Sequence, residues 1–327
     1  MKDRNQLILN QRRDFGDVIG DGLKFMKINF KPMFTVFLTY VVPVFLIPLV
    51  LILFMGYLPI FLGAFSINPG DTIDPSTVMG SMIGILMGML VFMVFVVIAY
   101  MIINLTVYGA FLAYEDNGNE VVTVDQIKGY IKSKFGNYLI SLLILLPILI
   151  GVYILTFVMA MVGAVLGVFA VLVTFTVLGC GFLWFFISII NFSWIRVKEE
   201  VDIGEGFRRA FYLTKQNWWS TFGVLFVAGI VTTIASYAFS IPFHTALGFA
   251  DISGFDSGGS STTMIIIAGF GFLIYMLGST YVQQFSSVCI IMKYYDQVEM
   301  KDGSSIAAQI DELGESNDSF FENEGEY

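Results

Sequence analysis

The chain has 327 residues, of which 57% are hydrophobic and only 13% are charged. Soluble domains carry about a quarter charged residues, so this composition excludes an ordinary soluble protein. The formal net charge of −9 reflects an acidic tail, since the residues from Lys293 onward include ten acids and two bases.

Five long stretches of the chain contain no Asp, Glu, Lys or Arg, and the longest, 135–195, has 61 residues. A helix needs about 20 apolar residues to cross the hydrocarbon core of a bilayer, so this stretch can hold two spans. The stretches are apolar on every face, which favours helices over the strands of a membrane barrel. We therefore predict an all-α polytopic membrane protein with six transmembrane helices, at about 33–63, 79–113, 138–160, 166–194, 220–248 and 263–291.

The basic residues predict the threading of these spans. The connections 64–78, 161–165 and 249–262 contain no Lys or Arg, and all 17 basic residues lie in the segments on the other side. The positive-inside rule then places both termini in the cytoplasm. The first apolar stretch begins too late for a cleavable signal sequence. We expect a multi-pass protein of the bacterial inner membrane.

Three glycines of the second predicted span, Gly80, Gly84 and Gly88, recur at every fourth residue. This spacing allows close helix packing. Packing inside the fold is the favoured interpretation, and a dimer face is the alternative.

Three predicted cytoplasmic stretches, starting at Ile19, Thr123 and Ile203, resemble one another. Each contains the pattern acid–any–apolar–base, and each later has Asn followed by an aromatic residue. Apolar residues recur in all three at helical spacing, which predicts amphipathic helices that lie at the membrane surface. These apolar positions are Ile19, Leu23, Met26 and Phe30; Ile127, Tyr130, Ile131, Phe135 and Tyr138; and Phe207, Ala210, Phe211, Thr214 and Trp218.

The repeat predicts three tandem units, at about 12–113, 121–194 and 201–292, each with one interfacial helix followed by two spans. The alternative is that any linker beside a membrane span is basic and aromatic for topological reasons alone. Under the repeat hypothesis we expect anionic membrane lipids as partners. The side chains predicted to contact headgroups are Lys24, Lys27, Lys128, Lys132, Arg208, Arg209, Lys215, Trp218 and Trp219.

Two motifs carry a family resemblance. "IGEGFRRAFYLTKQNWW", from Ile203, is followed by a span, and "CIIMKYYDQVEMKDGSSIAAQIDEL" closes the last one. Loosely over residues 12–312, the chain resembles bacterial multi-span proteins that include the membrane domain found beside glycerophosphodiester phosphodiesterases. The second motif is similar to the end of stand-alone members from Bacteroidetes-type bacteria. The resemblance implies the architecture and adds no activity, and no stretch here is long enough for the accompanying hydrolase domain.

The sequence offers little for catalysis. His244, the only histidine, follows Pro242 near the outer end of the fifth predicted span, where an ordinary polar residue at a helix end is the simpler interpretation. No carboxylate pair lies within a span. With one histidine and two separated cysteines no Cys/His metal cluster can form. We expect no enzymatic activity, no cofactor, no metal and no nucleic-acid partner.

Polar residues inside the predicted spans are the remaining candidates for a site. They either form hydrogen bonds between helices or line a substrate site. They are Asn104, Asn191, Gln283, Gln284, Ser286 and Ser287.

We predict a membrane domain over 1–292 and an acidic cytoplasmic tail over 293–327, with a short helix near 304–313 and a disordered end. The tail is a possible site for a basic protein partner. The favoured function is a non-enzymatic structural, accessory or lipid-interacting component. A transporter or channel for a lipid or other apolar solute is the alternative, and a membrane-bound enzyme is a third hypothesis.

Overall fold

The computed structural model describes residues 7–47, 75–252 and 262–303, and the regular elements in these ranges are all helices. The predicted all-α class is confirmed for this part of the chain. The predicted tail helix and parts of the first span and of two connections lie outside the described residues. The labelled helices are α1 (Phe15–Ile28), α2 (Phe30–Val36), the π-helix η1 (Phe37–Val41), α5 (Pro75–Asp116), α6 (Val124–Leu166), α7 (Val168–Ile189), α8 (Phe192–Lys198), α9 (Ile203–Thr214), α10 (Trp218–Ile252) and α11 (Thr262–Asp302).

Among the described residues, five helical stretches are long and apolar enough to cross a membrane, and they coincide with the first five predicted spans. These helices indicate a membrane protein. The sixth predicted span lies in α11, which is not among the five, so six spans are not confirmed. The five stretches are Phe30–Ile47, Met82–Asp116, Val124–Met159, Phe175–Lys198 and Trp218–Thr245.

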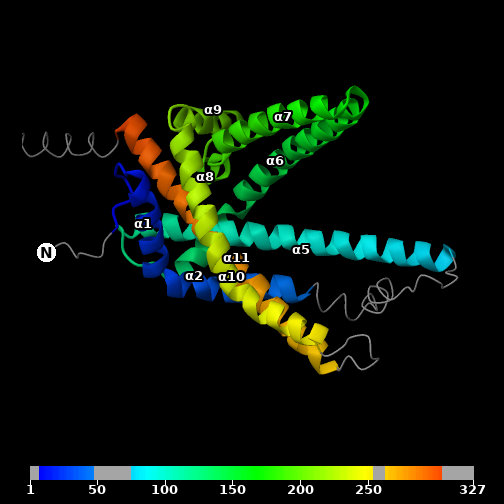
Figure 1. Cartoon of the computed structure of the whole chain (residues 1–327). Helices are drawn as coiled ribbons and strands as arrows, with labels where there is room; N and C mark the ends of the chain where they lie inside the picture. The colour runs from blue at the N-terminus through cyan, green and yellow to red at the C-terminus, as the bar shows by residue number, and fades with distance from the viewer. Residues whose placement is uncertain (1–6, 48–74, 253–261, 304–327) are drawn as a thin grey trace, which may run out of the picture.

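Three arms diverge from one region of the molecule (Figure 1). One arm is α5, the second is the α6–α7 pair, and the third is the α10–α11 pair, whose mutual contact is the most extensive in the fold. We call the region where the arms meet α1, α8 and α9 the helical base. A protein that lies partly in lipid and partly in water needs apolar segments for the lipid and charged segments for the water. The arms and the helical base have this division.

The hydrophobic core lies in the helical base, where aromatic side chains from five helices meet. Phe25 of α1 stacks on Phe111 of α5, with ring centroids 4.0 Å apart. Trp194 of α8 is fully buried against Tyr108 and Tyr295. These residues are far apart in sequence, so their packing joins the three arms at the base.

The outer part of α5 leaves this core and exposes its apolar side chains, including Met82 and Met93. A Cβ atom built at Gly88 would meet nothing within 4 Å, so the prediction of internal packing is wrong at this position. Close packing by glycine occurs instead between α10 and α11. A Cβ at Gly271 would lie 2.8 Å from the Cα of Phe243, which leaves no room for a side chain there.

The apolar faces of the amphipathic stretches differ in what they contact. In α9 the apolar face packs on the protein: Ala210 and Thr214 are buried, and Phe207 stacks on Phe192 at 4.1 Å. In α1 the buried residues are Val18, Gly22 and Phe25.

Leu23 of α1 and Phe30, which starts α2, belong to the predicted apolar face and are about half exposed. The protein packs on another side of α1, at Gly22, where α1 approaches α11 so closely that a Cβ would lie 3.1 Å from Cys289 Sγ. The outward apolar side chains of α1 remain free to contact lipid.

The second stretch departs from the other two. It begins with a capping box between Thr123 and Gln126 and continues without a break into the span as α6. Helices α1 and α9, in contrast, end before the following helix starts. Three equivalent tandem units are therefore not confirmed.

Candidate functional site

A cavity of about 380 Å³ lies between α5, α6, α7, α8, α10 and α11, where the arms join the helical base. Its wall is mostly aromatic and aliphatic, with Tyr108 and Tyr138 on one side, Phe185 and Trp194 on another, and Leu225 of α10 opposite. No charged residue lines it among the described residues. Such a wall suits a hydrocarbon group.

Four of the six predicted intramembrane polar residues line this cavity: Asn104, Gln283, Ser286 and Ser287. The Ser287 hydroxyl donates to Asn104 Oδ1 at 3.1 Å, and Asn104 Nδ2 donates to the Tyr100 carbonyl at 2.9 Å. The structure thus combines the two interpretations of these residues. They bond α5 to α11, and they present amide and hydroxyl groups to the cavity.

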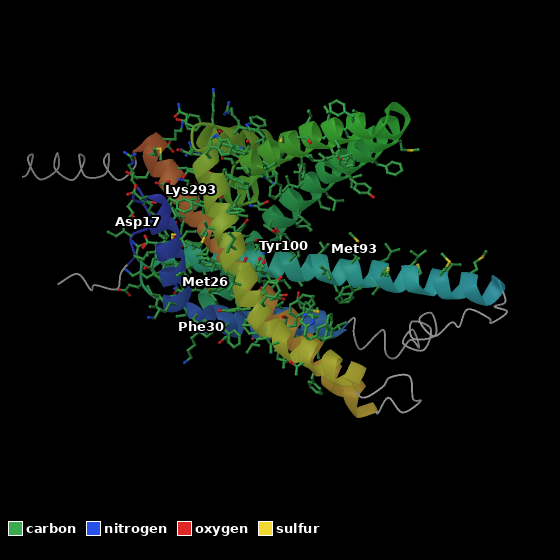
Figure 2. The ribbon with its side chains drawn as sticks, viewed as in Figure 1. Asp17, Met26, Phe30, Met93, Tyr100 and Lys293 are labelled. Atoms are coloured by element: carbon green, nitrogen blue, oxygen red, sulfur yellow. The ribbon has the colours of Figure 1, made fainter. Side chains whose placement is uncertain are left out.

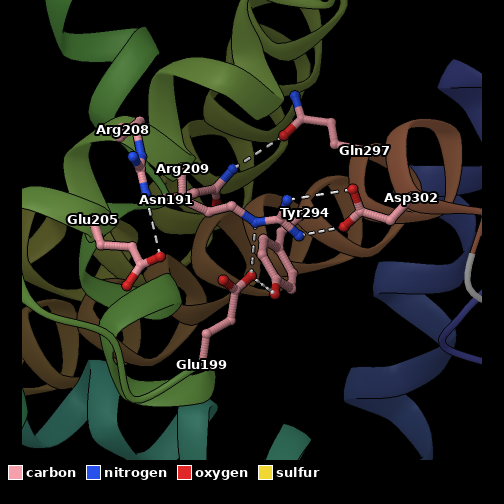
Figure 3. Close-up of polar contacts among 8 residues, drawn as sticks. All are labelled: Asn191, Glu199, Glu205, Arg208, Arg209, Tyr294, Gln297 and Asp302. Carbon is pink, nitrogen blue, oxygen red and sulfur yellow. Dashed lines mark hydrogen bonds and ion pairs between the residues drawn. The ribbon is translucent and has the colours of Figure 1, made fainter.

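The other two predicted polar residues lie elsewhere. Asn191 donates through Nδ2 to Gln297 Oε1 at 3.4 Å (Figure 3), and Gln297 donates to Thr221 at 2.8 Å. This chain of amides and a hydroxyl joins three helical segments. Gln284 is fully buried, and neither its Oε1 nor its Nε2 has a hydrogen-bond partner among the described residues.

Sequence analysis missed several cavity residues, above all Ser193 and Trp194. Both belong to α8, which starts after a break at Asn191 that the uninterrupted apolar stretch did not reveal. The available signal was only the pair of polar residues, Asn191 and Ser193, close to the end of that stretch. Trp194 Nε1 is buried and has no hydrogen-bond partner in the described part of the chain.

Three residues that line the cavity are also exposed, namely Tyr100, Phe182 and Phe186, and we call them the mouth residues. Figure 2 shows Tyr100 where α5 leaves the helical base, with Met93 farther out along the arm. All three mouth residues belong to helical stretches apolar enough to cross a membrane. A molecule dissolved in the bilayer could therefore enter from the side.

Ion pairs in the helical base connect the helices on the side away from the arms. Arg209 of α9 contacts the carboxylates of Glu199 and Asp302 (Figure 3). The hydrogen bond that Arg209 donates to Asp302, with further support from Glu199, raises the pKa of Arg209. Tyr294 donates to Glu199 at 2.6 Å, and burial together with this bond raises the pKa of its hydroxyl. This network ties α9 to α11.

Some of the residues predicted to contact headgroups are exposed, and others already form bonds within the protein. Arg209 is engaged in its two ion pairs, and Trp218 donates through Nε1 to the Trp184 carbonyl at 3.2 Å. Lys24 and Lys128 are half-buried. The exposed side chains are Lys27, Lys132, Arg208, Lys215 and Trp219, of which Arg208 pairs with Glu205.

Within the described ranges, no three His, Cys, Asp or Glu side chains are grouped so that they could hold a metal ion. His244 lies exposed on α10 beside the ring of Phe243.

Comparison of the chain with protein-family models, curated proteins and solved structures gave no match.

Proposed function

We propose that this chain is a non-enzymatic integral membrane protein that binds a lipid in the cavity between its arms. The observation that carries this proposal is the cavity itself, with a mostly apolar wall that also includes amide and hydroxyl side chains, among them Asn104, Gln283, Ser286 and Ser287. Small-ligand sites are concave and mostly apolar, with a few polar groups that fix orientation. The cavity matches that description and opens among apolar helices.

The size of the cavity limits the occupant. Its volume of about 380 Å³ is near the lower end of the range of roughly 300–1,000 Å³ for small-ligand sites. We therefore expect it to hold one hydrocarbon chain and not a whole phospholipid. The hydroxyl groups of Ser286 and Ser287 would orient a polar part of that molecule.

We also propose that the protein lies in the inner membrane, with the helical base and both termini in the cytoplasm. The exposed cations support this orientation. Arg208 lies in the middle of α9, Lys215 directly follows its last residue, and Trp219 lies in the first turn of α10 with its ring exposed. Each exposed cation near an anionic leaflet contributes about 1 kcal/mol to surface binding. This arrangement fits the resemblance to the membrane domain found beside glycerophosphodiester phosphodiesterases. The same resemblance supports three units and a sixth span in α11.

A transporter or channel for an apolar solute is the second candidate. The specific observation in its favour is that the cavity reaches Asn104 and Gln283 at the centre of the fold. Gln284, which a continuous polar path was expected to include, lies on another face of α11. A storage or accessory role is therefore preferred, and net flux of lipid between vesicle leaflets would support transport instead.

Lipid occupancy is tested by native mass spectrometry of the gently extracted full chain. Gly229 of α10 lines the cavity, and a Cβ there would meet nothing within 4 Å, so Gly229→Phe places a ring in the cavity without a backbone clash. Gly151→Phe is the matched control, because Gly151 also has open space but does not line the cavity. We expect bound lipid in the wild type and the control and its loss in Gly229→Phe. Equal lipid in all three would refute the proposal.

The orientation is tested separately by labelling intact cells with an amine reagent that does not cross the membrane. Lys128 and Lys215 should be modified only after the cells are opened. Modification of either lysine from outside would mean that the threading is inverted.

A further inference from the structure

Arg196 of α8 is a buried cation without a carboxylate partner. The residue is 8% exposed, and no ion pair joins it to a carboxylate in the described ranges. Its Nη1 donates to Ser141 Oγ at 2.9 Å and lies 3.5 Å from the Asn137 carbonyl, while Nε has no partner. The other largely buried basic side chains of the helical base, those of Arg13 and Lys293, do have carboxylate partners.

A buried charge without a countercharge is costly, and proteins seldom keep one without a use. Packing holds this side chain in place. A Cβ at Gly206 of α9 would lie 2.9 Å from Arg196 Cγ, and the guanidinium lies 6.0 Å from the ring centroid of Phe192. Ser141, the Asn137 carbonyl and the Phe192 ring offset only part of the cost of burying this charge. The site therefore lacks one negatively charged group.

The cavity adjoins this arginine. Ser141 lies four and seven residues before Leu145 and Ile148, the two α6 residues that line the cavity farther out, so all three share one face of the helix. Ser193, which lines it from α8, lies three residues before Arg196, close to one turn of the helix. Arg196 is not itself a lining residue, so the guanidinium lies behind the wall of the cavity, on the side where it bonds Ser141.

We propose that Arg196 binds the oxyanion of an anionic amphiphile whose hydrocarbon chain occupies the cavity. The inference rests on the proposed lipid-binding function and specifies its ligand class: one chain with a carboxylate or phosphate head. A guanidinium suits either group because its planar N–H donors match two oxygens at once. The anion supplies the charge that the protein does not provide, and the apolar wall takes the chain.

The test uses the full-length protein in a neutral detergent with four probes: palmitate, hexadecyl phosphate, hexadecanol and inorganic phosphate. Binding is followed by tryptophan fluorescence, since Trp194 lines the cavity. We expect the two anionic amphiphiles to bind about tenfold or more tightly than hexadecanol, as charge-assisted bonds imply. Inorganic phosphate should neither bind at comparable concentrations nor displace palmitate, because it lacks the chain.

Arg196→Gln removes the charge and should reduce the affinity for palmitate to that for hexadecanol, while hexadecanol binding stays unchanged and reports that the variant is folded. Arg196→Lys keeps the charge and should keep part of the preference, which guards against a variant that fails to fold. Arg12→Gln is the control, because it removes an exposed guanidinium that neither lines the cavity nor belongs to the predicted headgroup contacts. It should leave all four affinities unchanged.

The outcomes separate the two proposals. If Gly229→Phe abolishes amphiphile binding but Arg196→Gln keeps the preference for anions, the role of Arg196 is refuted and the lipid cavity stands. If Gly229→Phe leaves palmitate binding unchanged, the lipid cavity is refuted. Tight binding of inorganic phosphate that depends on Arg196 would identify a free-anion site and refute the amphiphile.

Discussion

Lys293 and Asp296 of α11 form a buried ion pair, with Nζ and Oδ2 2.6 Å apart and side-chain exposures of 4% and 1%. The other oxygen of Asp296 accepts from the backbone amide of Arg13 at 2.9 Å. The pair therefore holds the segment that precedes α1 against α11, at the centre of the helical base.

Asp296→Asn should destabilise the fold strongly, because it leaves the charge of Lys293 buried without compensation. Removing one partner of a buried pair costs about 3–5 kcal/mol. The measurement is reversible unfolding in detergent micelles. Glu205→Gln, in an exposed pair with Arg208, is the control and should cost well under about 1 kcal/mol.

The double variant Lys293→Met with Asp296→Asn sharpens this test. It removes both charges and keeps an oxygen that can accept from the Arg13 amide. It should be more stable than Asp296→Asn alone. If the single variant unfolded like the Glu205→Gln control, the pair would have no structural importance.

Arg209→Ala should lower stability by roughly 1–3 kcal/mol, because the side chain bonds two carboxylates from different segments and is mostly buried. Arg208→Ala, one position along α9, is the matched control and should be nearly neutral. The thermal midpoint of both variants in one detergent distinguishes them. Equal midpoints would mean that the contacts with Glu199 and Asp302 contribute little.

The exposed cations Arg208 and Lys215 should attract the α9 region to an anionic membrane surface. Arg208→Glu combined with Lys215→Glu should increase protease cleavage of the 199–217 region in vesicles with anionic lipid, because attraction of about 1 kcal/mol per cation becomes repulsion. In vesicles of neutral lipid the variant and the wild type should be cleaved alike. Unchanged protection in anionic vesicles would count against a surface role for α9.

Gly271→Ala should destabilise the α10–α11 pair. The added Cβ would approach the backbone of Phe243 to 2.8 Å, and overpacking of this kind costs about 1–3 kcal/mol. Gly269→Ala, two positions earlier with open space around it, should be neutral or slightly stabilising, since alanine favours helix. Opposite signs in a denaturation assay are expected, and a stabilising Gly271→Ala would contradict the observed packing.

Glu200 should contribute to acid sensitivity in a small way. Lys134 donates to its carboxylate and lowers the pKa of Glu200. Its contribution to stability is therefore present above the unfolded pKa of about 4.3 and is lost as the pH falls through the lower folded value. Because Glu200 is exposed, solvent screens the pair, and Glu200→Gln should change the neutral-pH midpoint little.

This prediction is checked by an NMR titration of the Glu200 carboxyl group, which should titrate below the ordinary glutamate value. The unfolding of Glu200→Gln at neutral and at acid pH is compared with that of Glu120→Gln. Glu120→Gln is the control, because no ion pair joins Glu120 to a described cation. A carboxyl group that titrates at or above the ordinary value would contradict the contact with Lys134.

Several features of the fold could be predicted from local sequence alone. Helix type and five membrane-crossing stretches follow from apolar length. Which side of α1 and α9 packs on the protein could not be predicted, because this packing depends on distant residues: Gly22 meets Cys289, more than 260 residues later. The cavity was predicted only in part, since Asn104 and Gln283 stood out as polar but Trp194 looked like any apolar residue.

The sequence by itself determined where this protein is apolar and where its charges gather, because hydropathy and charge are properties of each segment. Only the tertiary structure decided which cations are satisfied. Arg209 meets Asp302 from 93 residues away, whereas Arg196 meets a serine and a backbone carbonyl and no carboxylate. Pairing depends on which distant segments approach each other, and local pattern does not contain that information.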